Sequence, residues 1–139
     1  MAHLNPYLNF TNNCREAMTF YKDCLGGELV FMLVADMPEM AAQMPPEMKN
    51  AIMHSSLTNG NIILMGSDLN RDTALEGNTV QLCINCDNEA QLHEFFNKLS
   101  AGGEISEPVA NMPWGAVYGA LKDKYGKRWQ LNFQVENQM

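Results

Sequence analysis

Basic residues and long apolar runs are scarce in this sequence, and each shortage excludes a class of function. Only 9 Lys and Arg residues stand against 16 Asp and Glu residues, so the net charge is −7 and no basic cluster is present to bind nucleic acid or an anionic membrane. No apolar run approaches the roughly 20 residues of a membrane-spanning helix. The first residues lack the basic and apolar regions of a signal peptide. We therefore expect a cytoplasmic protein with no nucleic-acid or membrane partner.

Cysteine is also sparse, with four residues, and we expect reduced thiols in the cytoplasm. Cys83 and Cys86 have the C-x-x-C spacing of redox and zinc sites. They lie in a strand-like run, however, where residues three apart point to opposite faces. A zinc site also needs a second pair of ligands. We favour buried structural thiols over a redox or zinc site.

The clearest pattern lies near the end of the chain. Residues 116–121 form an apolar, β-prone run, residues 123–126 have turn chemistry, and residues 128–133 alternate strictly. The two faces of the last run are an apolar one with Trp129, Leu131 and Phe133 and a polar one with Arg128, Gln130 and Asn132. The run predicts a hairpin whose polar face is either a solvated edge or the wall of a cavity.

Helix signals occur twice, 75 residues apart. Asn13 and Glu16 form a weaker version of the capping box, and Asn88 and Gln91 repeat it. Two glycines end each helix. The apolar stripes of the two helices are Ala17, Phe20, Tyr21, Cys24 and Leu25, and Leu92, Phe95, Phe96 and Leu99. The spacing predicts that Phe20 and Phe95 occupy equivalent helix positions.

Strand-like runs flank both helices. They cover residues 4–10, 28–35, 51–58 and 62–67 in the first half, and 79–85, 116–121 and 128–133 in the second. Two copies of a βαβββ module account for this order, which places the protein in the α+β class. With 46% hydrophobic residues in 139, the chain suits a single domain made of two modules, at roughly 1–70 and 77–135.

A Met- and Pro-rich segment, residues 36–50, joins two strands of the first module. Four methionines recur there at nearly helical spacing, but Pro45 and Pro46 break any long helix. We favour a short helix and loop that patch the core over an adaptable lid above a pocket. The sequence leaves open whether the segment is a lid, core or a dimer contact.

Several stretches together resemble the PhnB-like branch of the vicinal oxygen chelate superfamily, which includes glyoxalase I, extradiol dioxygenases and bleomycin-resistance proteins. The branch has also been labelled demethylubiquinone methyltransferase-like. The stretches are Pro6-Tyr-Leu-Asn-Phe, Cys14-Arg-Glu-Ala-Met-Thr-Phe-Tyr-Lys, Leu25-Gly-Gly-Glu-Leu, Met53-His-Ser, Trp114-Gly-Ala-Val-Tyr-Gly and Asp123-Lys-Tyr-Gly-Lys-Arg-Trp. The resemblance implies two βαβββ modules curled around a central cleft, and a homodimer. The sequence does not support methyl transfer, because no Gly-rich loop follows a strand and opens a helix.

In the metalloenzymes of this superfamily, a divalent ion lies in the cleft on four residues from the first and last strands of each module. The resemblance places these positions at Pro6, Leu64, Gln81 and Gln130. Pro6 and Gln81 are themselves 75 residues apart, as the repeat predicts. None of the four, nor any residue adjacent to them, is a histidine or a carboxylate, which a divalent metal prefers. We expect no metal and no cofactor, with a divalent metal as the less favoured alternative.

Five residues are candidates for ligand binding. Gln81, Arg128 and Gln130 are expected to line one pocket with Trp114 or Tyr118 nearby. The aromatic side chains fit either core packing or stacking on a flat ligand, and the arginine suits an anionic group. His54 is a weak catalytic candidate, because a lone strand histidine is more often a hydrogen-bonded structural residue than a base or ligand.

These observations favour a small-molecule-binding protein whose cleft lacks the usual metal ligands and takes an anionic or aromatic ligand. The alternative is a metal-dependent lyase, isomerase or dioxygenase that uses unexpected ligands such as His54. A structural dimer module without ligand is the weakest interpretation, since burying polar side chains such as Asn85 and Asn132 without a partner costs free energy. The sequence does not decide whether a reaction is catalysed.

Overall fold

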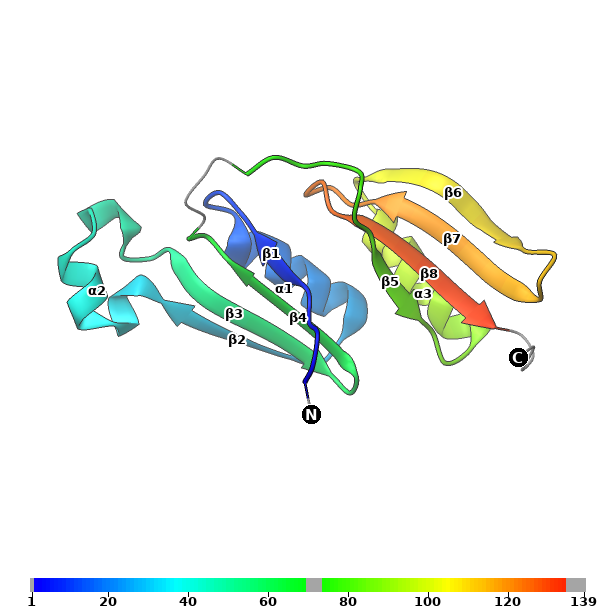
Figure 1. Cartoon of the computed structure of the whole chain (residues 1–139), viewed down its shortest axis with the longest axis horizontal. Coiled ribbons are helices and arrows are strands. Elements are labelled where there is room, and N and C mark those ends of the chain that lie inside the picture. Colours follow the sequence, from blue (N-terminus) through cyan, green and yellow to red (C-terminus); the bar gives the residue numbers. More distant parts are fainter. Residues whose placement is uncertain (1, 70–73, 135–139) are drawn as a thin grey trace. The chain divides into compact units, whose positions relative to one another are not determined.

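A computed structural model describes residues 2–69 and 74–134 and divides the chain into two compact units, Met1–Leu75 and Glu76–Met139. Each unit has the order strand, helix and three strands, as predicted (Figure 1). Whether the two units form a single domain stays a prediction. None of the helices in the described ranges has the length and apolar character needed to cross a membrane.

The first unit contains a four-stranded sheet in the order β1-β4-β3-β2, with one helix packed against it. Its strands are β1 (Tyr7–Asn9), β2 (Glu28–Leu33), β3 (Ile52–Asn59) and β4 (Ile62–Ser67), and its main helix is α1 (Cys14–Leu25). β1 pairs with β4 in parallel, and the other pairs are antiparallel. The short elements η1 (Val34–Asp36), α2 (Pro38–Ala42) and η2 (Pro46–Met48) lie between β2 and β3.

The second unit repeats this topology with the order β5-β8-β7-β6. Its elements are β5 (Leu82–Asn85), α3 (Glu89–Ser100), β6 (Glu104–Asn111), β7 (Ala116–Lys122) and β8 (Arg128–Gln134). β5 pairs with β8 in parallel. α3 packs along one face of this sheet (Figure 1).

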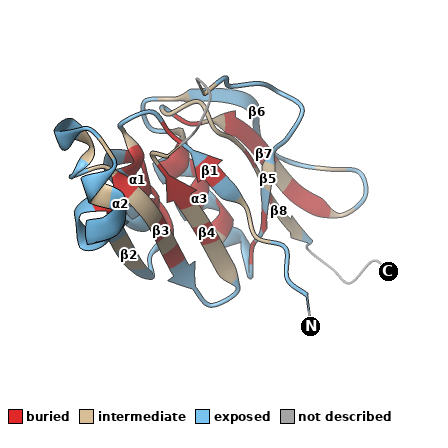
Figure 2. Ribbon diagram, turned by 60° about the vertical axis from the view of Figure 1, so that its left-hand side comes forward, coloured by how far each residue is buried: buried red, intermediate tan, exposed pale blue. Residues whose placement is uncertain are grey.

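The core of each unit lies between its helix and its sheet, because the helix stripe and alternate strand residues are both apolar. On α3, the predicted stripe of Leu92, Phe95, Phe96 and Leu99 is buried. On α1, Ala17, Tyr21, Cys24 and Leu25 are buried and Phe20 is half-buried. The buried residues of α1 and β7 are red in Figure 2. Both helices exist where the sequence predicts them, with Phe20 and Phe95 inside them.

The backbone N–H groups at the starts of the two helices have different hydrogen-bond acceptors. Asn88 caps α3 with its side chain, which accepts a 2.7 Å hydrogen bond from the Gln91 N–H. Asn13 makes no such side-chain bond, so the predicted cap of α1 is wrong. Asp68 acts instead, because one carboxylate oxygen accepts from the Cys14 N–H at 3.0 Å and the other from the Ile52 N–H at 3.0 Å. This carboxylate ties the start of α1 to the start of β3.

Two predicted strands are shorter than expected. β1 begins at Tyr7 rather than at Leu4, and β5 begins at Leu82 rather than at Thr79. Val80, which lies in the predicted run of residues 79–85 but precedes β5, is 76% exposed. The strand β6 has no counterpart among the predicted runs of the second module, since most of its side chains are exposed and it shows no apolar alternation.

The Met- and Pro-rich segment forms two short helical turns, as expected from its prolines. α2 and η2, which the structure describes in full, contain no buried residue. Met37 is 43% exposed and Met40 is 38% exposed. The interpretation that this segment patches the core is therefore wrong.

Candidate functional site

The second sheet has one face toward α3 and one face away from it, which we call the second open face. Gly119 lies on the helix side, since a Cβ there would be 2.8 Å from Cε2 of Phe96. Trp129 and Leu131, both buried, share that side. Because side chains alternate along a strand, Tyr118 of β7 and Gln130 of β8 lie on the second open face.

Strand register brings further polar residues onto this face. Tyr118 is the partner of Asn132 across β7 and β8, and Cys83 is the partner of Gln130 across β5 and β8. Asn85 pairs with Asn132, whose Nδ2 donates to Asn85 Oδ1 at 3.3 Å. Paired residues on neighbouring strands point to the same side of a sheet. The second open face is therefore a largely polar surface in which Tyr118, Gln130 and Asn132 are half-buried, with Ala120 between them as the partner of Gln130.

The ionisable groups of the second open face favour their neutral forms. Burial raises the pKa of the Tyr118 phenol, and the Glu107 carboxylate and Cys83 act in the same direction. Burial also raises the pKa of the Cys83 thiol. At neutral pH both groups are protonated and able to donate a hydrogen bond. Together with the amides, they offer a ligand neutral donors and acceptors rather than a nucleophile.

Arg128 lies at one end of this face. It is the first residue of β8, opposite Lys122, and its Nε donates to the Gly77 carbonyl at 3.2 Å. The guanidinium is thus half-buried and tied to the chain that leads into β5, rather than directed at bulk solvent. It lies two residues from Gln130 on the same face, and whether the two residues line a pocket stays a prediction.

Trp114 and Gln81 are less well placed to bind a ligand together with the other three candidate residues. Trp114 is 60% exposed in the connection between β6 and β7, and its carbonyl accepts from Gln134 Nε2 at 3.2 Å. Gln134 and Arg128 are the two ends of β8, which a strand rise of 3.4 Å separates by roughly 20 Å. Gln81 is exposed and precedes β5. The structure brings Tyr118, Gln130 and Arg128 onto one surface, but it does not bring Trp114 to Arg128.

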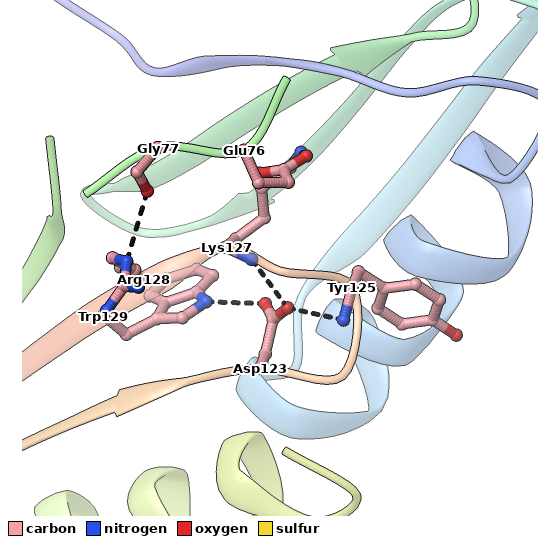
Figure 3. A network of polar contacts seen from close by, with 7 residues as sticks. All are labelled: Glu76, Gly77, Asp123, Tyr125, Lys127, Arg128 and Trp129. Carbon is pink, nitrogen blue, oxygen red and sulfur yellow. Dashed lines mark hydrogen bonds and ion pairs between the residues drawn. The ribbon is translucent and has the colours of Figure 1, made fainter. Parts of the chain in front are cut away.

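A tight turn fixes the start of β8, and hence the position of Arg128 (Figure 3). Asp123 Oδ1 accepts from the backbone N–H groups of Tyr125 and Lys127, at 2.8 and 3.0 Å. Asp123 Oδ2 accepts from Trp129 Nε1 at 2.8 Å. Lys127 Nζ bonds Glu76 Oε2 at 2.6 Å, which holds the segment that also carries Gly77. This network holds the start of β8 in position, and it does not lie on the second open face.

Sequence reasoning missed Cys83 and Glu107 as members of this surface. Cys83 was interpreted as a buried structural thiol, but it is exposed, and only Cys86 of the pair is buried. Glu107 lies on β6, a strand that shows no apolar alternation by which it could be predicted. The alternation of β5 could have identified Cys83, because Ile84, its neighbour, is buried and pairs with the buried Leu131.

The first sheet also has a face away from its helix, the first open face. Ser55 lies on the helix side, with its Oγ 3.5 Å from Cys14 Sγ, so the adjacent His54 lies on the open side. The Tyr7 hydroxyl is 3.0 Å from His54 Nδ1, and the two rings have centroids 5.6 Å apart. His54 is thus a hydrogen-bonded strand histidine, half-buried on a sheet face.

The positions carried over for a metal do not share one kind of environment. Leu64 is 2% exposed and pairs with Leu57 in the core, whereas Gln130 lies on an open face. Pro6 is an acceptor only through its backbone, where the Met65 N–H donates at 3.2 Å. Within the described residues no group of three His, Cys, Asp or Glu side chains could hold a metal ion. The donor set does not fit a divalent metal, and whether the protein binds one stays a prediction.

The 75-residue spacing is also wrong for the first strands of the two units. The Phe10 N–H donates to the Ser67 carbonyl, and the Cys86 N–H donates to the Asn132 carbonyl in the same way. Phe10 and Cys86 are therefore equivalent, one residue further apart than the two helices. By this register Gln81 is not the counterpart of Pro6, and the counterpart of Gln130 is Met65.

Comparison with known proteins gives consistent results. Residues 2–132 match the family model described as 3-demethylubiquinone-9 3-methyltransferase. Protein PA1353 from Pseudomonas aeruginosa is 32% identical, with a TM-score of 0.81 over 96% of this chain and 98% of that one. A structure from Bacillus cereus, described as a putative 3-demethylubiquinone-9 3-methyltransferase and PhnB protein, is 23% identical, with a TM-score of 0.70 over 95% and 99% of the two chains.

A glyoxalase/bleomycin resistance protein/dioxygenase from Nocardioides shares the fold at 21% identity, with a TM-score of 0.62 over 99% of this chain and 85% of that one. These matches agree with the two βαβββ units. The chain belongs to the family described as 3-demethylubiquinone-9 3-methyltransferase, and it has the fold of a glyoxalase/bleomycin resistance protein/dioxygenase.

Proposed function

We propose that this protein binds a small organic molecule on the second open face and does so without a resident metal. The observation that supports the proposal most is the group of half-buried polar side chains formed by Tyr118, Gln130 and Asn132. Polar groups of this kind are costly to bury unless a partner satisfies them. Small-molecule sites typically place a few such groups among apolar walls.

The chemistry of the surface suggests which ligand it takes. Tyr118 offers an aromatic ring and a phenolic hydrogen, and Gln130 offers both an amide donor and an acceptor. Arg128, at the end of the face, adds a positive charge that suits an anionic group. A planar molecule with one anionic substituent would satisfy all three. Without an activated base or nucleophile among them, these groups suit holding such a molecule better than transforming it.

Methyl transfer is not part of the proposal, although the matching family carries that word in its description. The connections from strand to helix are residues 10–13 and 86–88, and neither contains glycine. A doubly wound nucleotide site would have a Gly-rich loop at this point. A metal-dependent lyase, isomerase or dioxygenase remains the alternative, with His54 as its first residue to test.

A thermal-shift screen of small anions and aromatic acids against the whole chain tests the proposal. A ligand at about 100 times its dissociation constant should stabilise the protein by roughly 2.7 kcal/mol. Gln130→Ala and Tyr118→Phe should each weaken this effect, and Arg128→Ala should remove it for anions only. Asn97→Ala, on the exposed surface of α3, serves as a matched control.

The proposal fails if no compound in the screen stabilises the protein, or if the control weakens binding as much as Gln130→Ala does. Arg128 donates to an exposed backbone carbonyl, so its removal should cost the unliganded protein less than about 1 kcal/mol. Unfolding of Arg128→Ala would make this residue structural. The expected homodimer is a separate proposal, which light scattering tests against the 15.6 kDa monomer mass.

A further inference from the structure

Four methionines in the connection between β2 and β3 belong neither to the core nor to the proposed ligand site. They fall within the twelve residues 37–48, and we call Met37, Met40, Met44 and Met48 the methionine cluster. Met37 and Met40 are exposed, and Met44 and Met48 are half-buried. Because α2 and η2 contain no buried residue, packing of the core does not explain why this connection is so rich in methionine.

Backbone hydrogen bonds place three of these methionines along one helical turn. The Ala41 N–H donates to the Met37 carbonyl at 2.9 Å, and the Gln43 N–H donates to the Met40 carbonyl at 3.1 Å. The turn continues past α2, since the Met44 N–H donates to the Ala41 carbonyl at 3.3 Å. Residues three and four apart share one side of a helix, with Cβ atoms about 5–6 Å apart. Their spacing therefore groups Met37, Met40 and Met44 on one side of this turn.

The fourth methionine returns to the base of the same loop, which extends beyond the ends of β2 and β3 (Figure 1). The Val34 N–H donates to the Ala51 carbonyl at 3.1 Å and closes the base. The Met37 N–H donates to the Val34 carbonyl, and the Ala51 N–H donates to the Met48 carbonyl, both at 3.0 Å. Met37 and Met48 are therefore each joined by one backbone hydrogen bond to the same pair of residues.

The chemistry of thioether sulfur determines which ligand the cluster suits. The sulfur of methionine is a soft, polarizable donor with no proton to lose. Soft sulfur ligands select monovalent copper, whereas magnesium, calcium and manganese prefer oxygen. Zinc is bound by thiolate, imidazole and carboxylate groups. A set of four thioethers therefore suits Cu(I) better than any of these divalent ions.

The charges around the cluster favour a cation. Residues 36–50 contain three acidic residues and one basic residue, so their net charge is 1 − 3 = −2. Glu39 and Glu47 are exposed, whereas Asp36 accepts from the Leu33 N–H at 2.9 Å. Within residues 2–69 and 74–134, no group of three His, Cys, Asp or Glu side chains could hold a metal ion. The carboxylates of the loop thus attract a cation without forming a site for a divalent one.

We propose that the methionine cluster binds Cu(I), with the sulfurs of Met37, Met40 and Met44 as ligands and Met48 as the fourth. The methionine side chain has three rotatable bonds, so sulfurs from neighbouring turns can converge on one ion. The ion is bound without a change of oxidation state. The site includes no residue of either open face and does not rest on the function proposed above.

Titration of the whole chain with Ag(I), a redox-inert ion of the same charge and softness, tests the site, and titration with Cu(I) under anaerobic conditions follows. Cys83 is an exposed thiol that binds both ions, so every sample carries Cys83→Ser. NMR of the methionine methyl groups reports where the ion lies. We expect saturable shifts at the four methionines of the cluster with Ag(I) and Cu(I), and none with Mg²⁺ or Zn²⁺.

Leucine variants separate the sulfur atoms from the shape of the side chains, because leucine and methionine have similar volumes. Met37→Leu and Met40→Leu should each weaken Ag(I) binding at least about 10-fold, since changes to groups that only orient metal ligands already cost about 10- to 100-fold in affinity. Leucine at all four positions should abolish the binding. Met112→Leu, at a half-buried methionine between β6 and β7, is the matched control and should bind Ag(I) like its parent.

Three results would overturn the inference. The first is an absence of saturable shifts at the cluster with both Ag(I) and Cu(I), a result that needs no methionine variant to fold. The second is unchanged Ag(I) affinity when all four positions are leucine, or an equal loss in Met112→Leu and Met37→Leu, because the ion would then lie elsewhere. The third is an equal response of the cluster to Zn²⁺, which would make the carboxylates of Glu39 and Glu47 the ligands.

Discussion

The indole Nε1 of Trp129 donates a 2.8 Å hydrogen bond to Oδ2 of Asp123, a carboxylate that is only 2% exposed. The other oxygen of Asp123 accepts from the N–H groups of Tyr125 and Lys127. One buried carboxylate therefore closes the turn between β7 and β8 and anchors the first inward residue of β8. The register that places Gln130 and Arg128 on the second open face follows from this turn.

Asp123→Ala should destabilise the protein strongly, because it removes the acceptor of three hydrogen bonds in a buried place. We expect a loss of roughly 2–4 kcal/mol in the free energy of unfolding, measured by urea denaturation. Trp129→Phe removes one of the three donors and some buried volume, and should cost roughly 1–3 kcal/mol. Asp23→Asn, on the exposed surface of α1, is the control and should stay within about 0.5 kcal/mol of wild type. Equal stability of Asp123→Ala and the control would refute the role given to this turn.

The two equivalent cap residues should differ in their contribution to stability. Asn88→Ala removes the acceptor of the Gln91 N–H and should cost about 1 kcal/mol. Asn13→Ala removes no side-chain cap bond and should cost less than about 0.5 kcal/mol. Asp68→Ala should lower the free energy of unfolding more than either of these variants, since its carboxylate accepts hydrogen bonds at the starts of both α1 and β3. A larger loss from Asn13→Ala than from Asn88→Ala, in the same urea assay, would contradict the assignment.

Gly119 is required where β7 passes under α3. A Cβ at this position would lie 2.8 Å from Phe96 Cε2 and 2.9 Å from Val109 Cγ2. Gly119→Ala should therefore overpack the core and destabilise the protein by roughly 1–3 kcal/mol. Gly77→Ala, where a Cβ meets nothing within 4 Å, is the matched control and should change little. A stable Gly119→Ala would mean that α3 can move away from the sheet without cost.

Local patterns predicted the elements of this fold well, because α1, α3 and most strands bury one periodic face. The stripe from Leu92 to Leu99 and the alternation from Trp129 to Phe133 both use side-chain spacing that a single segment contains. β6 was not predicted, because it has no such periodic apolar face. It lies at the edge of its sheet with most side chains exposed, so no face of it needs to be apolar.

Features that depend on distant parts of the chain could not be predicted. The cap of α1 comes from Asp68, which is far along the sequence, and no local signal distinguishes it from Asn13. The first strands of the two units are one residue further apart than the helices, because the connection to α1 is one residue longer than the connection to α3. A shift of one residue exchanges the two faces of a strand. Pro6 and Leu64, the positions that the resemblance implies, are each one residue away from Tyr7 and Met65, which the register pairs.

The purified protein should contain no stoichiometric zinc, nickel, manganese or iron. At the register positions that face away from the helices, Tyr7, Met65, Cys83 and Gln130 include no histidine or carboxylate, and burial disfavours the Cys83 thiolate. Elemental analysis of protein expressed without a tag, before and after dialysis against each metal, measures this directly. About one equivalent per chain that disappears in His54→Ala would revive the metalloenzyme alternative.

Alkaline pH should destabilise the protein through its buried thiols. Burial raises the pKa of Cys14 from 9.0 to about 11, a shift that the nearby Asp68 carboxylate increases and the Ser55 hydrogen bond opposes. Burial likewise raises the pKa of Cys86 to about 11. Because the folded state holds these protons more tightly than the unfolded chain, their contribution to stability is complete below pH 9 and is lost as the pH rises through 11.

For Cys14 alone, the rise of the pKa from 9.0 to about 11 corresponds to at most roughly 2–3 kcal/mol of stability lost between pH 9 and pH 11. Urea unfolding of wild type, Cys14→Ala and Cys14→Ala/Cys86→Ala at several pH values between 8 and 11 measures the loss. Both variants should be less stable than wild type at pH 8, since each leaves a small cavity, but their stability should fall less steeply above pH 9. Lysine and tyrosine side chains also titrate in this range, and their contribution is common to all three proteins. Parallel stability curves would show that neither thiol is held protonated by the fold, and the helix start at Cys14 would then have to be open to water.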